Sequence, residues 1–139
     1  MAKYISERLR RLGFSVLEEP IIPYHQTFRK PDLVAWRGDQ AIVCDVAITG
    51  DGWDPDRAHQ EKIRYYDCPE IRQWCRGLCE EATWQFGSAT LNWRGAVSLS
   101  SAGFLRAVGF TERDILIMSL RTLSGGWLIW RMWTNYGGG

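Results

Sequence analysis

KPDLVAWRGDQAIVCDVA, residues 30–47, consists of two apolar runs separated by a short polar stretch. The apolar runs are residues 33–36 and 41–44, and Arg37-Gly38-Asp39-Gln40 lies between them. Short apolar runs that flank a glycine-containing polar turn are typical of a β-hairpin. Because a hairpin brings its two outer ends side by side, we expect Asp32 and Asp45 to lie together.

Asp32 and Asp45 each place one carboxylate next to strongly apolar sequence. Two carboxylates at one place repel each other and desolvate poorly unless a cation lies between them. Carboxylate oxygens are the ligands that suit Mg²⁺ or Mn²⁺. The ordinary alternative is that each acid is a solvated strand residue or a turn cap. Because two acids converge from apolar strands, the metal site is the better interpretation.

The composition is that of an ordinary globular domain. The chain has 139 residues, of which 45% are hydrophobic and 24% charged, enough for one domain with a core. No apolar run approaches the ~20 residues of a membrane span, and arginines at 8, 10 and 11 do not fit a signal peptide. Four irregularly spaced cysteines favour a reducing compartment over a disulfide scaffold.

The basic residues are more informative by type than by number. A net charge of +1 argues against binding of nucleic acid by bulk charge alone. The 17 basic residues comprise 14 arginines and only three lysines, Lys3, Lys30 and Lys62. Arginine suits bidentate contacts to phosphate, so the distribution of charge still allows phosphate binding.

The rest of the chain shows alternating helix and strand patterns around the hairpin. Helical spacing that ends at a glycine marks residues 4–12, and Asp54 or Asp56 can cap a helix through Tyr66. The other expected elements are strands at 14–17 and 89–93, an extended piece at 21–22, and helices at 70–81, 100–108 and 112–123. Gly125-Gly126 would interrupt the last helix.

These elements predict an α/β fold with a small mixed β-sheet flanked by helices. We find no repeat and no internal linker, so residues 1–136 are expected to form a single domain. Residues 137–139 are all glycine and are expected to form a flexible tail.

Lys62 lies on the helix that should follow the hairpin. Ala58, Lys62 and Tyr65 or Tyr66 share one helix face by their i, i+4 and i+7 spacing. If that face is directed at the hairpin, Lys62 can reach the two acids and neutralise charge that develops on a phosphoryl group. The ordinary alternative is an exposed lysine paired with Glu61 or Asp54. The neighbouring acids favour the first interpretation.

The pieces described above resemble a known family, the PD-(D/E)xK restriction-like nucleases. Within it, the sequence is similar to the endonuclease domain of site-specific non-LTR retrotransposons, from about Phe14 to the last tryptophan. The motifs that carry the resemblance are Arg29-Lys30-Pro31-Asp32-Leu33-Val34, Asp45-Val46-Ala47-Ile48, Ala58-His59-x-x-Lys62 followed by Tyr65-Tyr66, Trp93-Arg94-Gly95, and Ile129-Trp130-Arg131-Met132-Trp133.

The resemblance implies a restriction-endonuclease-like fold and a role for particular residues. Asp32, Asp45, Lys62 and Tyr65 would be catalytic, and Asp32, Asp45 and the backbone carbonyl of Val46 would bind the metal. The lysine that names the family would fall at Ala47, so the resemblance implies that it has moved to Lys62. Candidates for contacts to DNA phosphates are Arg29, Lys30, Arg57 and Arg64. A family glutamate on the first helix would correspond to Glu7, although a plain exposed residue is the simpler explanation.

The activity implied is metal-assisted hydrolysis that nicks target DNA, so that a linked reverse transcriptase can extend the freed 3′-hydroxyl. The expected cofactor is Mg²⁺, with Mn²⁺ able to substitute. The expected partners are double-stranded target DNA and the reverse transcriptase and upstream DNA- or RNA-binding domains of the same polyprotein, in the nucleus and without a membrane.

Three alternatives remain open. The chain could be a catalytically inactive nuclease fold that binds DNA, although two buried acids have no purpose without chemistry. It could instead dock on its own polyprotein through an exposed apolar patch at Trp127, Trp130 and Trp133. Finally, His59 with Cys68, Cys75 and Cys79 could hold a structural zinc, but the cysteine spacing fits no zinc knuckle.

Overall fold

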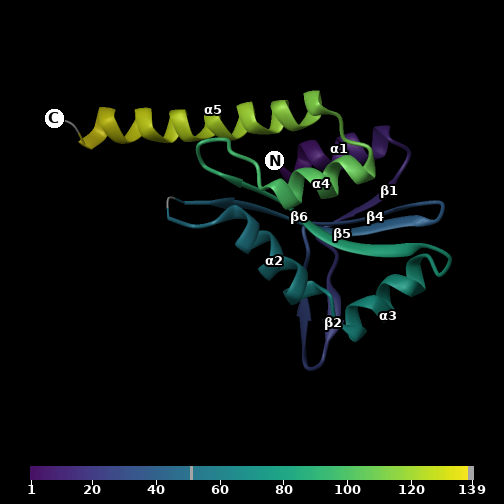
Figure 1. The fold of residues 1–139 in the computed structure, drawn as a ribbon. Coiled ribbons are helices and arrows are strands. Elements are labelled where there is room, and N and C mark those ends of the chain that lie inside the picture. The colour runs from purple at the N-terminus through teal and green to yellow at the C-terminus, as the bar shows by residue number, and fades with distance from the viewer. Residues whose placement is uncertain (51, 138–139) are drawn as a thin grey trace.

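The computed structural model describes the backbone of residues 1–50 and 52–137, and it contains the predicted hairpin (Figure 1). Strands β4 (Leu33–Arg37) and β5 (Gln40–Thr49) pair antiparallel around a two-residue turn. Gly38 begins that turn with φ of +57°, a conformation that favours glycine. The other elements are α1 (Ala2–Arg11), β1 (Ser15–Glu18), β2 (Ile22–Tyr24), β3 (Thr27–Arg29), α2 (Pro55–Tyr66), α3 (Pro69–Leu78), β6 (Thr83–Asn92), α4 (Leu99–Val108) and α5 (Glu112–Gly137).

The hairpin forms the centre of a four-stranded mixed sheet with the order β1-β4-β5-β6. Strand β1 pairs antiparallel with β4, whereas β6 pairs parallel with β5. A parallel pair needs a crossover, and here α2 and α3 provide it. The predicted α/β class, a small mixed sheet flanked by helices, is therefore confirmed.

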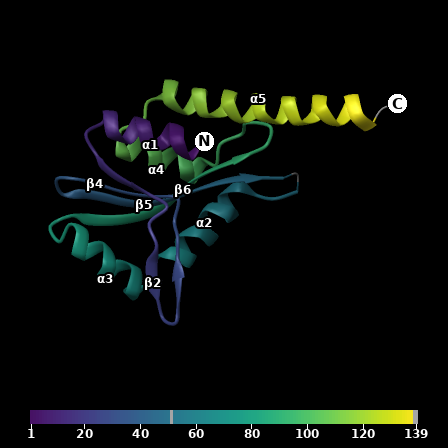
Figure 2. The same cartoon turned by 180° about the vertical axis from the view of Figure 1, so that it is seen from behind.

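Helices cover both faces of the sheet, and each face has its own core (Figures 1 and 2). On one face α1, α4 and α5 pack over residues such as Leu33, Ile42 and Leu91. On the other face α2, α3 and the small β2–β3 hairpin pack over residues such as Val43. Since side chains alternate along a strand, Asp45 follows Val43 onto the face that α2 covers.

Helix α2 is anchored at its start by two aspartates. Asp54 is the N-cap, and its side chain accepts a hydrogen bond of 3.0 Å from the backbone N–H of Asp56. Pro55 occupies the first helical turn, where its missing N–H costs nothing. Asp56 in turn accepts a bond of 3.0 Å from the backbone N–H of Ser100, at the start of α4. The two helices are thus tied together at one end.

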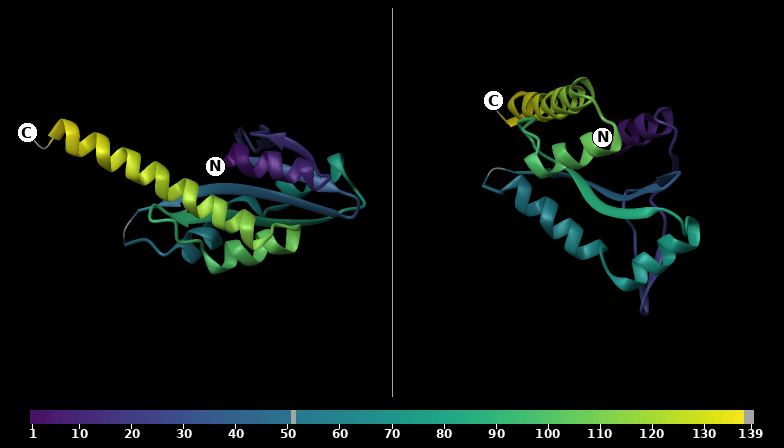
Figure 3. Two further views of the ribbon diagram at one scale, coloured as in Figure 1. Left: turned by 90° about the horizontal axis from the view of Figure 1, so that it is seen from above. Right: turned by 45° about the vertical axis from the view of Figure 1, so that its right-hand side comes forward.

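Three elements differ from the sequence prediction. Strand β6 begins at Thr83 rather than Ala89: residues 83–86 alternate between exposed and buried positions as a strand does, and Gly87, which weakens a strand pattern, follows them. The β2–β3 hairpin was predicted only as an extended piece at 21–22. Helix α5 continues through Gly125-Gly126, where an interruption was expected (Figure 3).

Some sequence predictions fall at the C-terminal end. Of the predicted glycine tail at 137–139, residues 138 and 139 lie outside the described residues, and Gly137 ends α5. The side chains of residues 125–137 also lie outside the described part of the chain, so the patch at Trp127, Trp130 and Trp133 stays a prediction. Among the described residues, no helix is both long and apolar enough to span a membrane.

Gly87 offers a direct test of how closely α4 packs on β6. A β-carbon added at Gly87 would lie 2.6 Å from Cγ of Phe104, so the ring would have to move. Gly87→Ala should lower the free energy of unfolding by about 1–3 kcal/mol, as overpacking of a core does. The control is Gly103→Ala, on the exposed side of α4 with no atom within 4 Å of the new carbon. It should be neutral or stabilising by up to about 1 kcal/mol. Equal urea midpoints for the two variants would contradict this packing.

Candidate metal centre

Asp32 and Asp45 meet at the open end of the central hairpin, one position beyond the last β4–β5 pair, Leu33 with Cys44. The backbone N–H of Asp32 donates to Asp45 Oδ1 at 3.1 Å. Asp32 Oδ2 accepts a hydrogen bond of 2.7 Å from the backbone N–H of Val46. Each carboxylate is therefore held by the backbone of the other strand, and the two acids lie side by side.

Lys62 reaches the pair from α2. Its Nζ lies 2.8 Å from Asp45 Oδ2. The Asp45 side chain is only 7% exposed, whereas the Lys62 side chain is 39% exposed. A buried carboxylate thus has one cationic partner, and that partner also faces solvent, where a substrate phosphate could approach it. The solvent-only alternative for Lys62, with pairing to Glu61 or Asp54, does not describe this geometry.

The hairpin register predicts that the carbonyl of Val46 points to the same place. In an antiparallel ladder, a residue of a hydrogen-bonded pair directs both its N–H and its C=O toward the same neighbouring strand. Because the Val46 N–H points at Asp32, the Val46 carbonyl lies along the same edge of β5. Continuing the observed register places Val46 opposite Pro31, which has no N–H to donate. The proline therefore leaves this carbonyl without a ladder partner from β4.

Electrostatics at the site show an excess of negative charge. The pKa of Asp32 is raised to about 6, chiefly because burial disfavours the charged form. Asp45 raises the pKa further, whereas the Val46 N–H and Lys62 favour the ionised carboxylate. Two ionised carboxylates and one lysine leave a net negative charge, which a bound cation would balance.

The donor set fits a hard divalent cation. Two carboxylates and one backbone carbonyl supply only oxygen, which Mg²⁺ and Mn²⁺ prefer, and Mg²⁺ usually keeps several waters. Within residues 1–50 and 52–124, no cluster of three or more His, Cys, Asp or Glu could hold a metal by itself. Water and a substrate phosphate would have to complete the coordination.

The two tyrosines after Lys62 have different environments. Tyr66 is buried, its hydroxyl donates to the carbonyl of Lys30 at 3.3 Å, and burial together with Asp45 raises its pKa. Tyr65 is 48% exposed, and its ring contacts the Arg29 guanidinium at 4.0 Å. The charges of both acids therefore act on the buried Tyr66, whereas Tyr65, which the resemblance marks as catalytic, is exposed beside Arg29.

The four predicted phosphate-binding residues differ in how firmly their side chains are held. Arg29 is held between the rings of Tyr24, at 3.8 Å, and Tyr65, and it donates to the Tyr65 carbonyl. Lys30 lies 4.0 Å from Glu19, and Arg57 lies 3.3 Å from Glu61, both as exposed pairs. Exposed ion pairs of this kind are weak, so a phosphate can displace them. Arg64 is exposed on α2.

The zinc alternative does not match the structure. His59 is buried, and its Nδ1 lies 2.8 Å from Ser88 Oγ and 2.9 Å from Ser101 Oγ. These contacts join α2 to β6 and α4, which is a packing role. Burial raises the pKa of the Cys75 thiol to about 12, and no metal-binding cluster with the cysteines occurs among the described residues.

Sequence reasoning did not single out the residues beside Asp32. A cavity of about 260 Å³ adjoins it, lined also by Lys3, Glu18 and Glu19. Glu19 has a φ of +48°, uncommon for a residue with a side chain, and its N–H donates to the Asp32 carbonyl at 2.9 Å. Lys3, Glu18 and Glu19 lie outside the hairpin motif, so its pattern does not mark them. Glu7, on α1, lines a different cavity.

The chain is similar to segments of much longer proteins. It is 41% identical over 123 residues to the Retrovirus-related Pol polyprotein from type-2 retrotransposable element R2DM of Drosophila melanogaster, covering 87% of this chain and 12% of that protein. The corresponding polyprotein of type-1 retrotransposable element R2 from Popillia japonica is 41% identical over 117 residues, 81% of this chain and 16% of that one. The one from Nasonia vitripennis is 27% identical over 130 residues, 92% of this chain and 13% of that one.

The homologues of this chain are therefore R2 retrotransposon Pol polyproteins, of which the chain spans 12–16% of the length. No protein-family model matches it. A solved structure of a protein of unknown function aligns with 86% of the chain at a TM-score of 0.43 and 13% identity, too low to support any argument.

The raised pKa of Asp32 predicts how stability depends on pH without metal. Between the ordinary pKa of 3.8 and about 6, the folded state binds more protons than the unfolded state, so stability falls as pH rises through this window. Asp32→Asn removes this dependence while keeping an acceptor for the Val46 N–H. In EDTA, the free energy of unfolding of the variant should increase relative to that of the wild type as pH rises from 4 to 6. Above pH 6 the difference between the two proteins should stay constant. A gain independent of pH in thermal melts would contradict the raised pKa.

Proposed function

We propose that this chain, whose homologues are R2 retrotransposon Pol polyproteins, is a divalent-metal-dependent DNA endonuclease. Its role would be to nick target DNA so that a linked reverse transcriptase can extend the freed 3′-hydroxyl. One observation carries the proposal: Asp32, Asp45 and Lys62 converge at the end of the hairpin, with Lys62 Nζ 2.8 Å from Asp45. Acids from two strands with a lysine from the next helix suit hydrolysis of a phosphodiester better than any structural purpose.

Asp32, Asp45 and the Val46 carbonyl would hold Mg²⁺, with Mn²⁺ able to substitute. When bound, the metal would supply an activated water and polarise the phosphate. The backbone N–H groups of Asp32 and Val46 already fix one oxygen of each carboxylate, so the acids would need little rearrangement.

Lys62 would act on the phosphate rather than on the metal. Its ammonium group is anchored by Asp45, and its side chain is 39% exposed, so Lys62 could contact a DNA phosphate that enters from solvent. A positive charge held there would offset the negative charge that develops during hydrolysis and orient the attacking water. Tyr65, at the exposed end of α2, would contact the substrate rather than the metal.

DNA would approach along the exposed face of α2 and the adjoining strand ends. Arg57, Arg64 and Lys30 could contact the backbone phosphates there, and Arg29 would hold the β2–β3 hairpin against α2 while directing charge to the same surface. Phosphate contacts of this kind position the duplex without reading its sequence. Target choice would then depend on other parts of the polyprotein, in which the DNA- or RNA-binding domains and the reverse transcriptase would act with this chain in the nucleus.

Asp45 provides the first test of the proposal. Asp45→Ala should reduce Mg²⁺-dependent nicking of supercoiled plasmid by at least about a hundredfold, because a metal ligand is lost. The fold should persist, since burial of this carboxylate costs stability rather than supplying it. Asp39→Ala removes an exposed acid from the hairpin turn and should nick like the wild type. EDTA should abolish nicking by all variants. Wild-type nicking by Asp45→Ala would show that the site lies elsewhere.

Lys62 separates catalysis from metal binding. Lys62→Ala should cut the nicking rate by about 10²–10³, the scale of losing one charge-stabilising group. Its affinity for Mn²⁺, measured by electron paramagnetic resonance, should not fall, because the lysine does not ligate the ion. Lys62→Arg should rescue poorly, since a planar guanidinium does not replace a compact ammonium group.

Lys30→Ala is the comparison variant, because Lys30 lies two residues before Asp32 and its ammonium group forms an exposed pair with Glu19. It should lose no more than the contribution of one phosphate contact. A Lys62→Ala rate within twofold of the wild type, with a large loss in Lys30→Ala, would assign the catalytic lysine to Lys30.

A further inference from the structure

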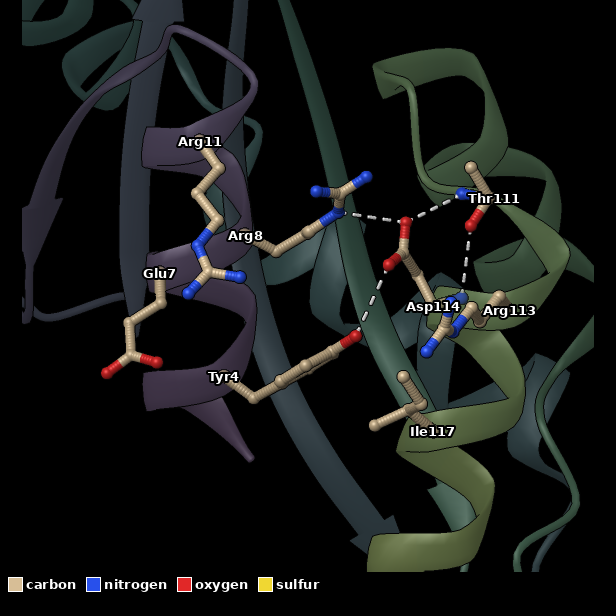
Figure 4. Close-up of a pocket in the computed structure, with 8 residues that line it drawn as sticks. All are labelled: Tyr4, Glu7, Arg8, Arg11, Thr111, Arg113, Asp114 and Ile117. Carbon is tan, nitrogen blue, oxygen red and sulfur yellow. Dashed lines mark hydrogen bonds and ion pairs between the residues drawn. The ribbon is translucent and has the colours of Figure 1, made fainter.

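A cluster of arginines lies on the sheet face opposite to the one that Lys62 faces. A cavity of about 510 Å³ opens between α1 and the first two turns of α5 (Figure 4). Arg8 and Arg11 line it from α1, and Arg113 lines it from α5. None of these arginines lines the cavity beside Asp32, and the core that α1 and α5 cover lies on the sheet face opposite to α2.

Arg8 is held in place by a buried acid. Its Nε donates to Asp114 Oδ2 at 3.0 Å, and Asp114 is 6% exposed. Asp114 is fixed in turn by the backbone N–H of Thr111, at 2.8 Å, and by the hydroxyl of Tyr4, at 3.3 Å. In Figure 4 a dashed line joins Arg8 to Asp114 through Nε, and the two terminal nitrogens carry no dashed line. Asp114 thus fixes the orientation of the Arg8 guanidinium through Nε, and the two terminal nitrogens can donate to a ligand.

Arg11 and Arg113 are exposed, and among the described residues neither has an ion pair or a hydrogen bond from its side chain. Arg121 adds a further charge above the Tyr4 ring, at 4.5 Å. The residues that line the cavity include three arginines and two acids, Asp114 and Glu7. Since Asp114 pairs with Arg8, the charges of Arg11 and Arg113 exceed what the lining acids balance.

We propose that this cavity binds the phosphodiester backbone of a nucleic-acid strand, at a place separate from the nicking centre. Arginine forks match the geometry of phosphate oxygens. The volume exceeds what a free phosphate needs and suits a nucleotide unit. The Tyr4 ring and Ile117 supply an apolar wall for the sugar. A strand bound there would lie on the sheet face opposite to α2, the helix that carries Lys62.

The test uses the 139-residue chain in EDTA, with fluorescein-labelled 12-nucleotide DNA and RNA as probes. Arg11→Ala combined with Arg113→Ala should weaken binding of one or both probes about tenfold at 0.1 M salt. The slope of log affinity against log salt should fall by about one to two, since each phosphate contact contributes about 0.7–0.9. Arg10→Ala with Arg76→Ala removes the same charge from exposed positions outside the cavity and should bind within twofold of the wild type.

Glu7 tests whether the ligand of this cavity is negatively charged, and this test does not depend on the arginine variants. A phosphate in the cavity is repelled by this carboxylate, so Glu7→Gln should tighten binding by about twofold to fivefold, as expected for an exposed charge. Weaker binding by Glu7→Gln would overturn the proposal. So would equal losses in the two double-arginine variants, or a poly-glutamate peptide that competes as well as the oligonucleotides.

Both measurements are independent of nicking, because EDTA removes the proposed metal. A chain that shows the expected losses but never nicks DNA would contradict the proposed function and leave this site standing. A chain that nicks DNA but binds the probes equally well without Arg11 and Arg113 would contradict this second site and leave the proposed function standing.

Discussion

The main physical constraint at the candidate site is the burial of two carboxylates at the open end of one β-hairpin. Two acids this close would normally be unfavourable, since burial and mutual repulsion both oppose ionisation. The chain offsets the cost with backbone N–H groups of Asp32 and Val46 and with the ammonium group of Lys62. The compensation is incomplete, as the raised pKa of Asp32 shows. Residual negative charge of this kind is what a site for a divalent cation requires.

The fold can be understood as the means of holding these groups together. The turn at Gly38 fixes the hairpin register, and that register sets Asp32 beside Asp45 and Pro31 opposite Val46. The parallel pairing of β5 with β6 requires a crossover, and its first helix, α2, carries Lys62 back over the sheet. Burial of His59 against β6 and α4 locks the rotation of α2, so that Lys62 faces the acids.

The hairpin, the convergence of its acids and the approach of Lys62 could be predicted because each depends on residues close in sequence. Turn chemistry sets the hairpin, and helix spacing sets the face of α2. The start of β6 was missed because Gly87 interrupts the strand pattern. Only a glycine leaves room there for the ring of Phe104, which belongs to another element. The environment of Tyr66 and the cavity between α1 and α5 likewise depend on tertiary packing between distant segments. Patterns within a short window do not contain that information.

The central claim is that the end of the hairpin is a metal site, and anomalous diffraction from Mn²⁺-soaked crystals of this chain tests it most directly. The account predicts one anomalous peak within about 2.0–2.3 Å of carboxylate oxygens from both Asp32 and Asp45, with the Val46 carbonyl as a further ligand. The remaining ligands should be waters, and Lys62 should stay outside the coordination sphere. A well-occupied peak elsewhere, or no peak here at millimolar Mn²⁺ and neutral pH, would contradict the account.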